Sequence, residues 1–249
     1  MNKLKTILAV SVLILLVNIP SFAQSPMTLQ LGGGLGYVSP MGNYGGSTMD
    51  YYAGTKYGLS SGINIHGKAR LEFLGFNLNG EIGYTWLSNS GNSEPGQGSI
   101  NISQKVFSIK VGPEIQFKIP LSPITPYLGA NISLNSFSGD ASFQGVAKIP
   151  SADYAMQNAV RVGLGLGGGI ILGISRNMNL DIGIQYNFLN VFGKSWNNAN
   201  AASDQRLNSY LALNDAADPN YINDSNVNFI NSSRSINTLS ISATLMFVL

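Results

Sequence analysis

Strict alternation between apolar and polar residues is the feature that most restricts how this chain folds. From Phe107 to Ile119 the odd positions are apolar, whereas the even positions are Ser, Lys, Gly, Glu, Gln and Lys. A strand places successive side chains on opposite faces, whereas a helix repeats every 3.6 residues. This segment is therefore predicted to be a strand with one apolar and one polar face.

The same pattern recurs along the chain and predicts eight strands. The other seven span residues 29–37, 57–71, 74–86, 128–134, 160–172, 180–188 and 239–249. The longer of these strands, with about 11–15 residues, exceed the five or six typical of soluble sheets and suffice to cross a hydrocarbon core with tilt. A half-buried strand of a soluble sandwich is the alternative, but it leaves the regular charge on the polar face unexplained.

The connections between these strands alternate in length. Residues 39–55, 88–104, 138–158 and 193–235 form long segments rich in Asn, Ser, Gly and Asp, whereas the connections near 72, 120–124 and 175–177 are short. Bacterial outer-membrane barrels have short turns in the periplasm and long loops outside. Because lipid offers no hydrogen bonds, the first strand must also pair with the last. The predicted fold is an all-β, eight-stranded antiparallel up-and-down transmembrane β-barrel.

Aromatic residues on the apolar faces are predicted to form two girdles, because amphipathic rings prefer the lipid headgroup level. The alternative, aromatic filling of a soluble core, does not require aromatic residues at strand ends. The predicted outer girdle contains Tyr37, Tyr57, Tyr84, Trp86, Phe107, Tyr186 and Phe188, and the periplasmic girdle contains Phe76, Phe117 and Phe247.

The N-terminus has the three parts of an export signal. Lys3 and Lys5 precede an apolar run at residues 7–17, and Ser21 and Ala23 provide small side chains before a cut at Gln24. This run of eleven residues, broken only by Ser11, falls short of the roughly 20 that a membrane-spanning helix needs. We therefore expect a cleaved signal peptide at 1–23, a single barrel domain at 24–249, and location in the outer membrane of a diderm bacterium.

Composition excludes several classes of protein. Without the two lysines of the signal, 12 basic residues balance 12 acidic ones and form no basic cluster, which argues against nucleic acid as a partner. The sequence contains no cysteine. Disulfides, thiolate zinc sites and iron–sulfur clusters are therefore excluded.

Strand number, loop alternation and the terminal strand resemble the small eight-stranded outer-membrane barrels of the OmpA/OmpX type, the outer membrane beta-barrel domain family. The resemblance covers residues 24–249. In that family the last strand is an assembly signal, and residues 239–247 match its alternation, although the chain ends on Leu249 instead of an aromatic residue. The resemblance implies that barrel-assembly machinery recognises the C-terminal strand and that outer-membrane lipid and lipopolysaccharide surround the barrel.

The polar faces are predicted to fill a lumen that is too narrow for an open aqueous pore. Because a dry interior must pair its charges, we expect a structural network of ion pairs and hydrogen bonds. Its predicted members toward the middle or outer part are Glu81, Lys110, Glu114 and Arg161, those toward the periplasmic end are His66, Lys68, Arg70, Lys118 and Asp181, and Gln185 shares the inward face.

No segment supports catalysis or cofactor binding. Gly163 to Gly168 matches a dinucleotide-binding glycine pattern, but no helix is predicted to follow it. The inward glycines are instead expected to make room for larger lumen side chains. The single histidine, His66, should face the lumen near the periplasm, whereas known lipid A-modifying barrel enzymes use a histidine near the outer leaflet.

Three functions remain open from the sequence. The leading hypothesis is a non-enzymatic barrel with a plugged polar lumen and a structural or adhesive role through four surface loops, with residues 193–235 as the possible ligand contact. A narrow channel for small hydrophobic molecules is the alternative, suggested by the glycine-lined strands. A lipid-modifying enzyme comes third. Asp215, Asp218 and Asp224 fit no calcium-loop spacing, so no metal site is predicted.

Overall fold

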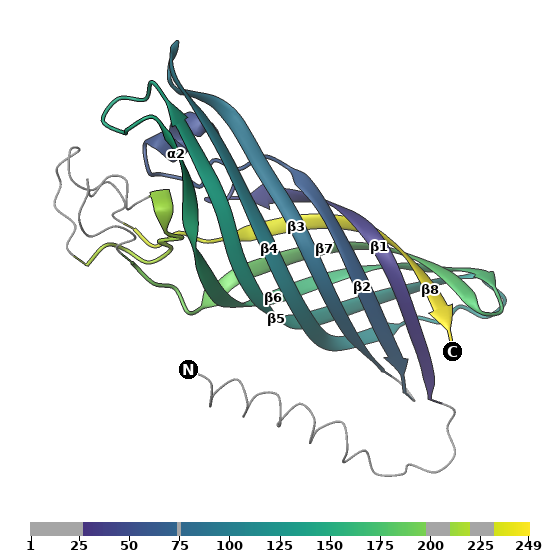
Figure 1. Cartoon of the computed structure of the whole chain (residues 1–249). Coiled ribbons are helices and arrows are strands. Elements are labelled where there is room, and N and C mark those ends of the chain that lie inside the picture. The colour runs from purple at the N-terminus through teal and green to yellow at the C-terminus, as the bar shows by residue number, and fades with distance from the viewer. Residues whose placement is uncertain (1–26, 74–75, 198–209, 220–231) are drawn as a thin grey trace.

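Eight antiparallel strands form a closed barrel in the computed structural model, which describes residues 27–73, 76–197, 210–219 and 232–249 (Figure 1). The prediction of an all-β eight-stranded barrel is confirmed. The strands are β1 (Thr28–Met41), β2 (Gly62–Glu72), β3 (Asn77–Glu94), β4 (Gln97–Gln116), β5 (Ile124–Gln144), β6 (Ala152–Ser175), β7 (Met178–Phe192) and β8 (Asn237–Val248).

Pairing between the first and last strands closes the barrel. Each strand pairs with its sequence neighbours, and β1 also pairs with β8 from Gln30–Val248 to Met41–Asn237. Closure leaves no strand edge in the lipid, where an unpaired backbone group has no water to bond to. We call the end that holds the β2–β3, β4–β5 and β6–β7 connections the turn end, and the opposite end the loop end.

The outer surface of the barrel is apolar. Leu35, Ile63, Leu128 and Leu166 point outward from four strands and are 60–68% exposed. Such a continuous apolar exterior is far larger than the patches that soluble monomers expose. It is the surface expected where lipid is the solvent. No helix within the described residues has the length and apolar character needed to cross a membrane.

Strands β3 to β6 extend well beyond the rest of the barrel at the loop end. They contain 18, 20, 21 and 24 residues, against 11 in β2 and 12 in β8. Most of residues 88–104 and 138–158, predicted as loops, are therefore strand. Their outward Ser and Asn residues are typical of loops, but Ile100, Ile102 and Phe143 on the inner face are fully buried.

A compact apolar cluster fills the space inside this protruding sheet. The first long connection carries a short helix, α2 (Thr48–Tyr52), which starts with a reciprocal capping box between Ser47 and Asp50. Tyr51 of α2 stacks on Phe143 of β5 and contacts Tyr210, with ring centroids 6.4 and 5.1 Å apart. We call residues 42–61 and 210–219, which pack inside the sheet, the cap.

Tyr57 belongs to the cap and not to the outer girdle, so that prediction is wrong. Its side chain is 6% exposed, its hydroxyl donates to the Leu213 carbonyl at 2.8 Å, and the Arg234 guanidinium lies 4.0 Å from its ring centroid. Gly58, at φ +67°, turns the chain inward, and β2 begins only at Gly62. The short apolar alternation at residues 57–59 is therefore part of a loop.

Candidate functional site: the lumen and the cap

Charged side chains form a buried cluster in the lumen at the turn end. Arg70 of β2 donates to Glu114 of β4 at 3.0 Å and to Asp181 of β7 at 2.6 Å. Lys68 also lies 2.6 Å from Asp181, whose other oxygen accepts from the Tyr127 hydroxyl at 2.7 Å. We call these five residues the base layer.

Burial makes the base layer depend on its pairing. Arg70, Glu114 and Asp181 are at most 1% exposed, and two cations face two carboxylates. Gln30 accepts a further hydrogen bond from Arg70, and Asn79 donates to Glu114. Buried ions persist only where their partners and hydrogen bonds are nearly complete. These five residues therefore form a dense polar cluster drawn from four strands.

Glu114 lies at a different level from the one predicted. The sequence placed it toward the middle or outer lumen, whereas the register opposes it to Asn77, the first residue of β3 at the turn end. The sequence analysis ended the preceding loop at residue 104, whereas strand β4 begins at Gln97 in the protruding sheet. Heights estimated from the predicted loop boundary were therefore wrong along this strand.

Lys118 does not lie in the lumen as predicted. Its side chain is 74% exposed and lies 3.7 Å from Glu72.

The middle of the lumen is polar and partly hollow. Lys110 lies 2.9 Å from Glu81 and donates to Gln185 at 2.9 Å. His66 uses both ring nitrogens, with Asn64 at 2.9 Å and Thr244 at 2.8 Å. A cavity of about 100 Å³ lies among these groups. About 10–15 Å³ of such space holds one water molecule, so the cavity accommodates several.

Glycines let large side chains cross this lumen. A Cβ on Gly34 would lie 2.6 Å from the His66 ring, and one on Gly165 would lie 2.6 Å from the Asn131 amide. A Cβ on Gly169 would lie 2.7 Å from the Tyr127 hydroxyl. The glycine columns of β1 and β6 are thus covered by side chains from neighbouring strands.

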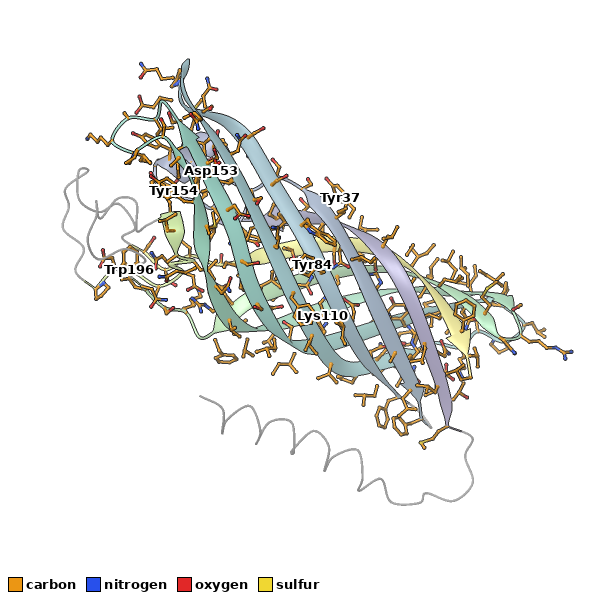
Figure 2. All side chains as sticks on the ribbon, viewed as in Figure 1. Tyr37, Tyr84, Lys110, Asp153, Tyr154 and Trp196 are labelled. Atoms are coloured by element: carbon orange, nitrogen blue, oxygen red, sulfur yellow. The ribbon has the colours of Figure 1, made fainter. Side chains whose placement is uncertain are left out.

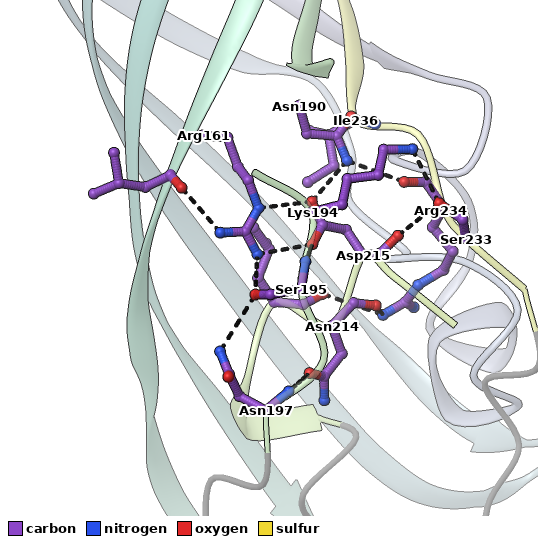
Figure 3. Close-up of polar contacts among 12 residues, drawn as sticks. Arg161, Asn190, Lys194, Ser195, Asn197, Asn214, Asp215, Ser233, Arg234 and Ile236 are labelled. Carbon is purple, nitrogen blue, oxygen red and sulfur yellow. Dashed lines mark hydrogen bonds and ion pairs between the residues drawn. The ribbon is translucent and has the colours of Figure 1, made fainter. Parts of the chain in front are cut away.

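At the loop end, Arg161 of β6 holds the cap in the mouth of the barrel (Figure 3). Its Nε and Nη2 donate to the two carboxylate oxygens of Asp215 at 2.8 and 2.7 Å. Asp215 also accepts from the Asn190 side chain at 2.9 Å and from the Ser195 backbone at 3.0 Å. A bidentate charged pair with two further donors fixes the cap residue in position and orientation.

Asn190 and Arg234 extend this arrangement to both flanks of the last long connection. Asn190 donates to the Arg234 carbonyl at 3.0 Å and accepts from the Ile236 backbone at 2.8 Å. Arg234 donates to the Asn214 carbonyl at 2.9 Å and lies over the Tyr57 ring. Sequence reasoning missed the roles of Asn190, Asp215 and Arg234. Asn190 lies just beyond the strand predicted at 180–188, although the observed β7 includes it. Asp215 and Arg234 lie in irregular segments, which carry no periodic signal that reveals partners across the fold.

Apart from Lys118, the predicted lumen residues lie inside the barrel as three separate groups. Lys68, Arg70, Glu114 and Asp181 share the base layer, Glu81, Lys110, Gln185 and His66 surround the cavity, and Arg161 pairs with the cap. His66 was predicted near the periplasmic end, and the strand register places it at mid-lumen instead. No group of three or more His, Asp or Glu residues that could hold a metal ion occurs among the described residues. Asp218 is buried, and Asp224 lies outside the described residues.

The remaining girdle candidates point outward at two levels. Tyr84 contacts Trp86 and Tyr186 contacts Phe188 near the loop end, with ring centroids 4.6 and 4.9 Å apart. Members that are more than a third exposed are Tyr37, Trp86, Phe107, Phe188, Phe76, Phe117 and Phe247.

The Asp215 contacts predict a pH-dependent cap. Burial raises the pKa of the Asp215 carboxyl, but hydrogen bonds from Arg161, Ser195 and Asn190 outweigh it and hold the pKa below its usual value. A carboxyl whose pKa is lower in the docked cap than in the unfolded chain stabilises the docked cap at pH values above the unfolded pKa of about 3.9. This stabilisation is lost as the pH falls through the pKa of the docked state. Hydrogen exchange in residues 210–219, corrected for intrinsic rates, should accelerate below about pH 4. This acid step should disappear in Asp215→Asn; if it persists there, another group is responsible.

The sequence matches the outer membrane protein beta-barrel domain family over residues 9–208. This chain belongs to that family. The barrel is therefore an outer-membrane protein. The match ends before β8, so the closing strand is seen in the structure and not in the matched segment.

Solved structures of outer-membrane proteins align with this barrel at low sequence identity. A major outer membrane protein from Thermus thermophilus aligns with a TM-score of 0.50 and 14% identity, over 89% of this chain and 99% of its own. Neisserial surface protein A gives 0.47 and 18%, over 90% and 97%. Ail, the attachment invasion locus protein of Yersinia pestis, gives 0.41 and 10%, over 90% and 97%. No curated protein matched the sequence.

Proposed function

We propose that this protein is a closed, non-enzymatic scaffold that presents an ordered surface at the cell exterior. In this orientation the turn end faces the periplasm and the loop end faces outward, as in bacterial barrels with unequal connections. The protruding sheet of β3 to β6 and the cap then form the surface available to a ligand. Adhesion-like contact is the role that such a rigid, loop-bearing surface supports.

Dense packing of side chains at both ends of the lumen is the observation that supports this proposal. The base layer fills the periplasmic end with fully buried ion pairs. The cap fills the outer end with apolar side chains and the Arg161–Asp215 pair. The cavity that lies between them has a volume of about 100 Å³. A solute would have to displace a buried charge cluster and an apolar core to pass.

The same geometry argues against the channel and enzyme alternatives. The glycine columns that suggested a channel lie beneath Tyr127, Asn131 and His66. His66 has both ring nitrogens engaged inside the closed lumen, so it has no free position to accept a proton from a nucleophile.

Planar-bilayer conductance tests the closed lumen. We expect purified barrel to insert without producing stable current steps, under conditions in which an open porin produces them. Folded insertion is checked by the shift in gel mobility on boiling. Stable steps from a heat-modifiable preparation would overturn the closed-lumen proposal and favour the channel.

Several partners remain proposals. The signal peptide at 1–23 and its cleavage lie outside the described residues. We propose that β8 serves as the assembly signal and that lipid and lipopolysaccharide contact the outward apolar band.

The connection at residues 193–235 was the predicted ligand contact. Its segment 210–219 is largely buried, so a surface ligand would instead contact exposed residues of the same connection, such as Lys194. We propose no nucleic-acid partner.

A further inference from the structure

The outer face of the protruding sheet is hollowed, and most of the side chains that line the hollow are polar. An open groove of about 720 Å³ lies over β3 to β6. We call it the outer groove. Six of its outward side chains are Ser88, Ser90, Asn101, Ser103, Ser142 and Asp153. Figure 2 shows Asp153 on the protruding part, at the loop end of the molecule.

The strand register arranges these side chains as an ordered row. Ser90 pairs with Asn101, Asn101 with Ser142, and Ser142 with Asp153, so one row crosses four strands. Neighbouring strands lie about 4.8 Å apart, and side chains on one face repeat about every 6.8 Å along a strand. The opposite face of this sheet packs on the cap, so the row is held on a rigid support.

The chemistry of the row suits a saccharide. Serine hydroxyls and the asparagine amide each donate and accept hydrogen bonds, and the Asp153 carboxylate accepts them. Sugar hydroxyls also do both. Lys105 lies beside the groove 3.5 Å from Asp140, so its charge has a carboxylate partner already. The groove therefore offers many neutral hydrogen-bonding groups and no concentrated positive charge for a phosphate.

The height of the groove selects among membrane lipids. On the outer face of β4, Ser103 and Asn101 lie four and six residues beyond the girdle residue Phe107. That is about 14 and 20 Å along the strand, or roughly 10 and 15 Å above the girdle at a tilt of about 40°. The headgroup region adds only about 5–8 Å on each side of the hydrocarbon core. A simple phospholipid headgroup would not reach the row, whereas an extended saccharide would.

We propose that the outer groove binds the saccharide headgroup of a glycolipid in the outer leaflet of the same membrane. The groove is continuous with the lipid-facing surface, because Ser88 follows Trp86 by two residues on the same face of β3. The acyl chains would pack on the apolar band while the sugars enter the groove above it. This inference rests on the orientation in the proposed function.

The test uses folded full-length barrel in detergent micelles, titrated calorimetrically with oligosaccharide released by mild acid from lipopolysaccharide. We expect wild-type protein to bind and Asn101→Ala/Ser142→Ala/Asp153→Ala to bind at least tenfold more weakly. The matched control, Glu94→Ala/Gln97→Ala at the exposed hairpin tip, should bind like wild type. In bilayers with intact lipopolysaccharide, less of this glycolipid should co-purify with the triple variant.

The proposal would be overturned by no oligosaccharide binding by wild type, by equal affinity in the triple variant, or by displacement of the oligosaccharide by phosphatidylglycerol micelles. Binding of free oligosaccharide without retention of intact glycolipid would also overturn it, because the groove would then serve a soluble glycan. A shift in gel mobility on boiling equal to that of wild type shows that the variants remain folded. Channel activity would refute the closed lumen but would not affect this binding result. Failure of oligosaccharide binding would refute the outer-groove proposal but would not affect the closed lumen.

Discussion

Replacing Arg70 with methionine should lower the free energy of unfolding of the barrel by about 3–5 kcal/mol, because it leaves buried carboxylates without their shared cation. Glu114 and Asp181 are at most 1% exposed, and Arg70 bridges them across the base layer. Methionine keeps much of the side-chain volume, so the loss reports on charge more than on packing. Urea titration of the barrel in micelles, followed by tryptophan fluorescence, measures the change.

A matched lysine variant separates this effect from a general loss of positive charge. Lys118→Met removes a cation near the same end, but its side chain is 74% exposed and 3.7 Å from Glu72. Exposed pairs contribute about 0–1 kcal/mol. The double variant Arg70→Met/Glu114→Gln should recover part of the Arg70→Met loss. A loss below about 1 kcal/mol for Arg70→Met would show that water or rearranged neighbours compensate the carboxylates.

Replacing Arg161 with methionine should release the cap, and cleavage within residues 210–219 by added protease should accelerate about 100-fold. Asp215 loses both charged hydrogen bonds of the bidentate pair while its carboxylate stays buried. Breaking a buried pair costs about 3–5 kcal/mol, and about 3 kcal/mol raises the open population roughly 100-fold. Limited proteolysis of intact barrels, read by mass spectrometry, gives the rate.

The control for this variant lies in the same connection. Lys194→Met removes an exposed cation that donates to the Ser233 hydroxyl at 3.1 Å, so cleavage should stay near the wild-type rate. Conductance should remain absent in Arg161→Met, because the base layer still closes the other end of the lumen. Equal cleavage of Arg161→Met and wild type would mean that the apolar contacts of the cap hold it without the ion pair.

The period-two pattern was sufficient to predict the barrel. Alternation is a local property of a strand, and lipid allows a sheet only if its edges pair, so residues 107–119 and their seven counterparts implied a closed ring. The same alternation told which side chains point inward, including Arg70, Glu81 and Arg161. Both inferences rest on the local residue pattern and on lipid as the surrounding solvent, and neither requires contacts between distant residues.

The partners of those inward charges depended on the tertiary structure. Stagger between tilted strands sets which levels meet, so Glu114 faces Arg70 and not the mid-lumen residues. Arg161 meets Asp215 across 54 residues, and Tyr57 lies in the cap, because irregular segments have no period from which a contact can be read. The protruding parts of the strands were predicted as loops for a related reason. Their outward Ser and Asn residues face water, and the apolar cap that covers their inner face is visible only in the tertiary structure. Sequence thus determined the ring of strands and the direction of each side chain, whereas stagger and loop packing determined which charges pair and how the lumen is closed.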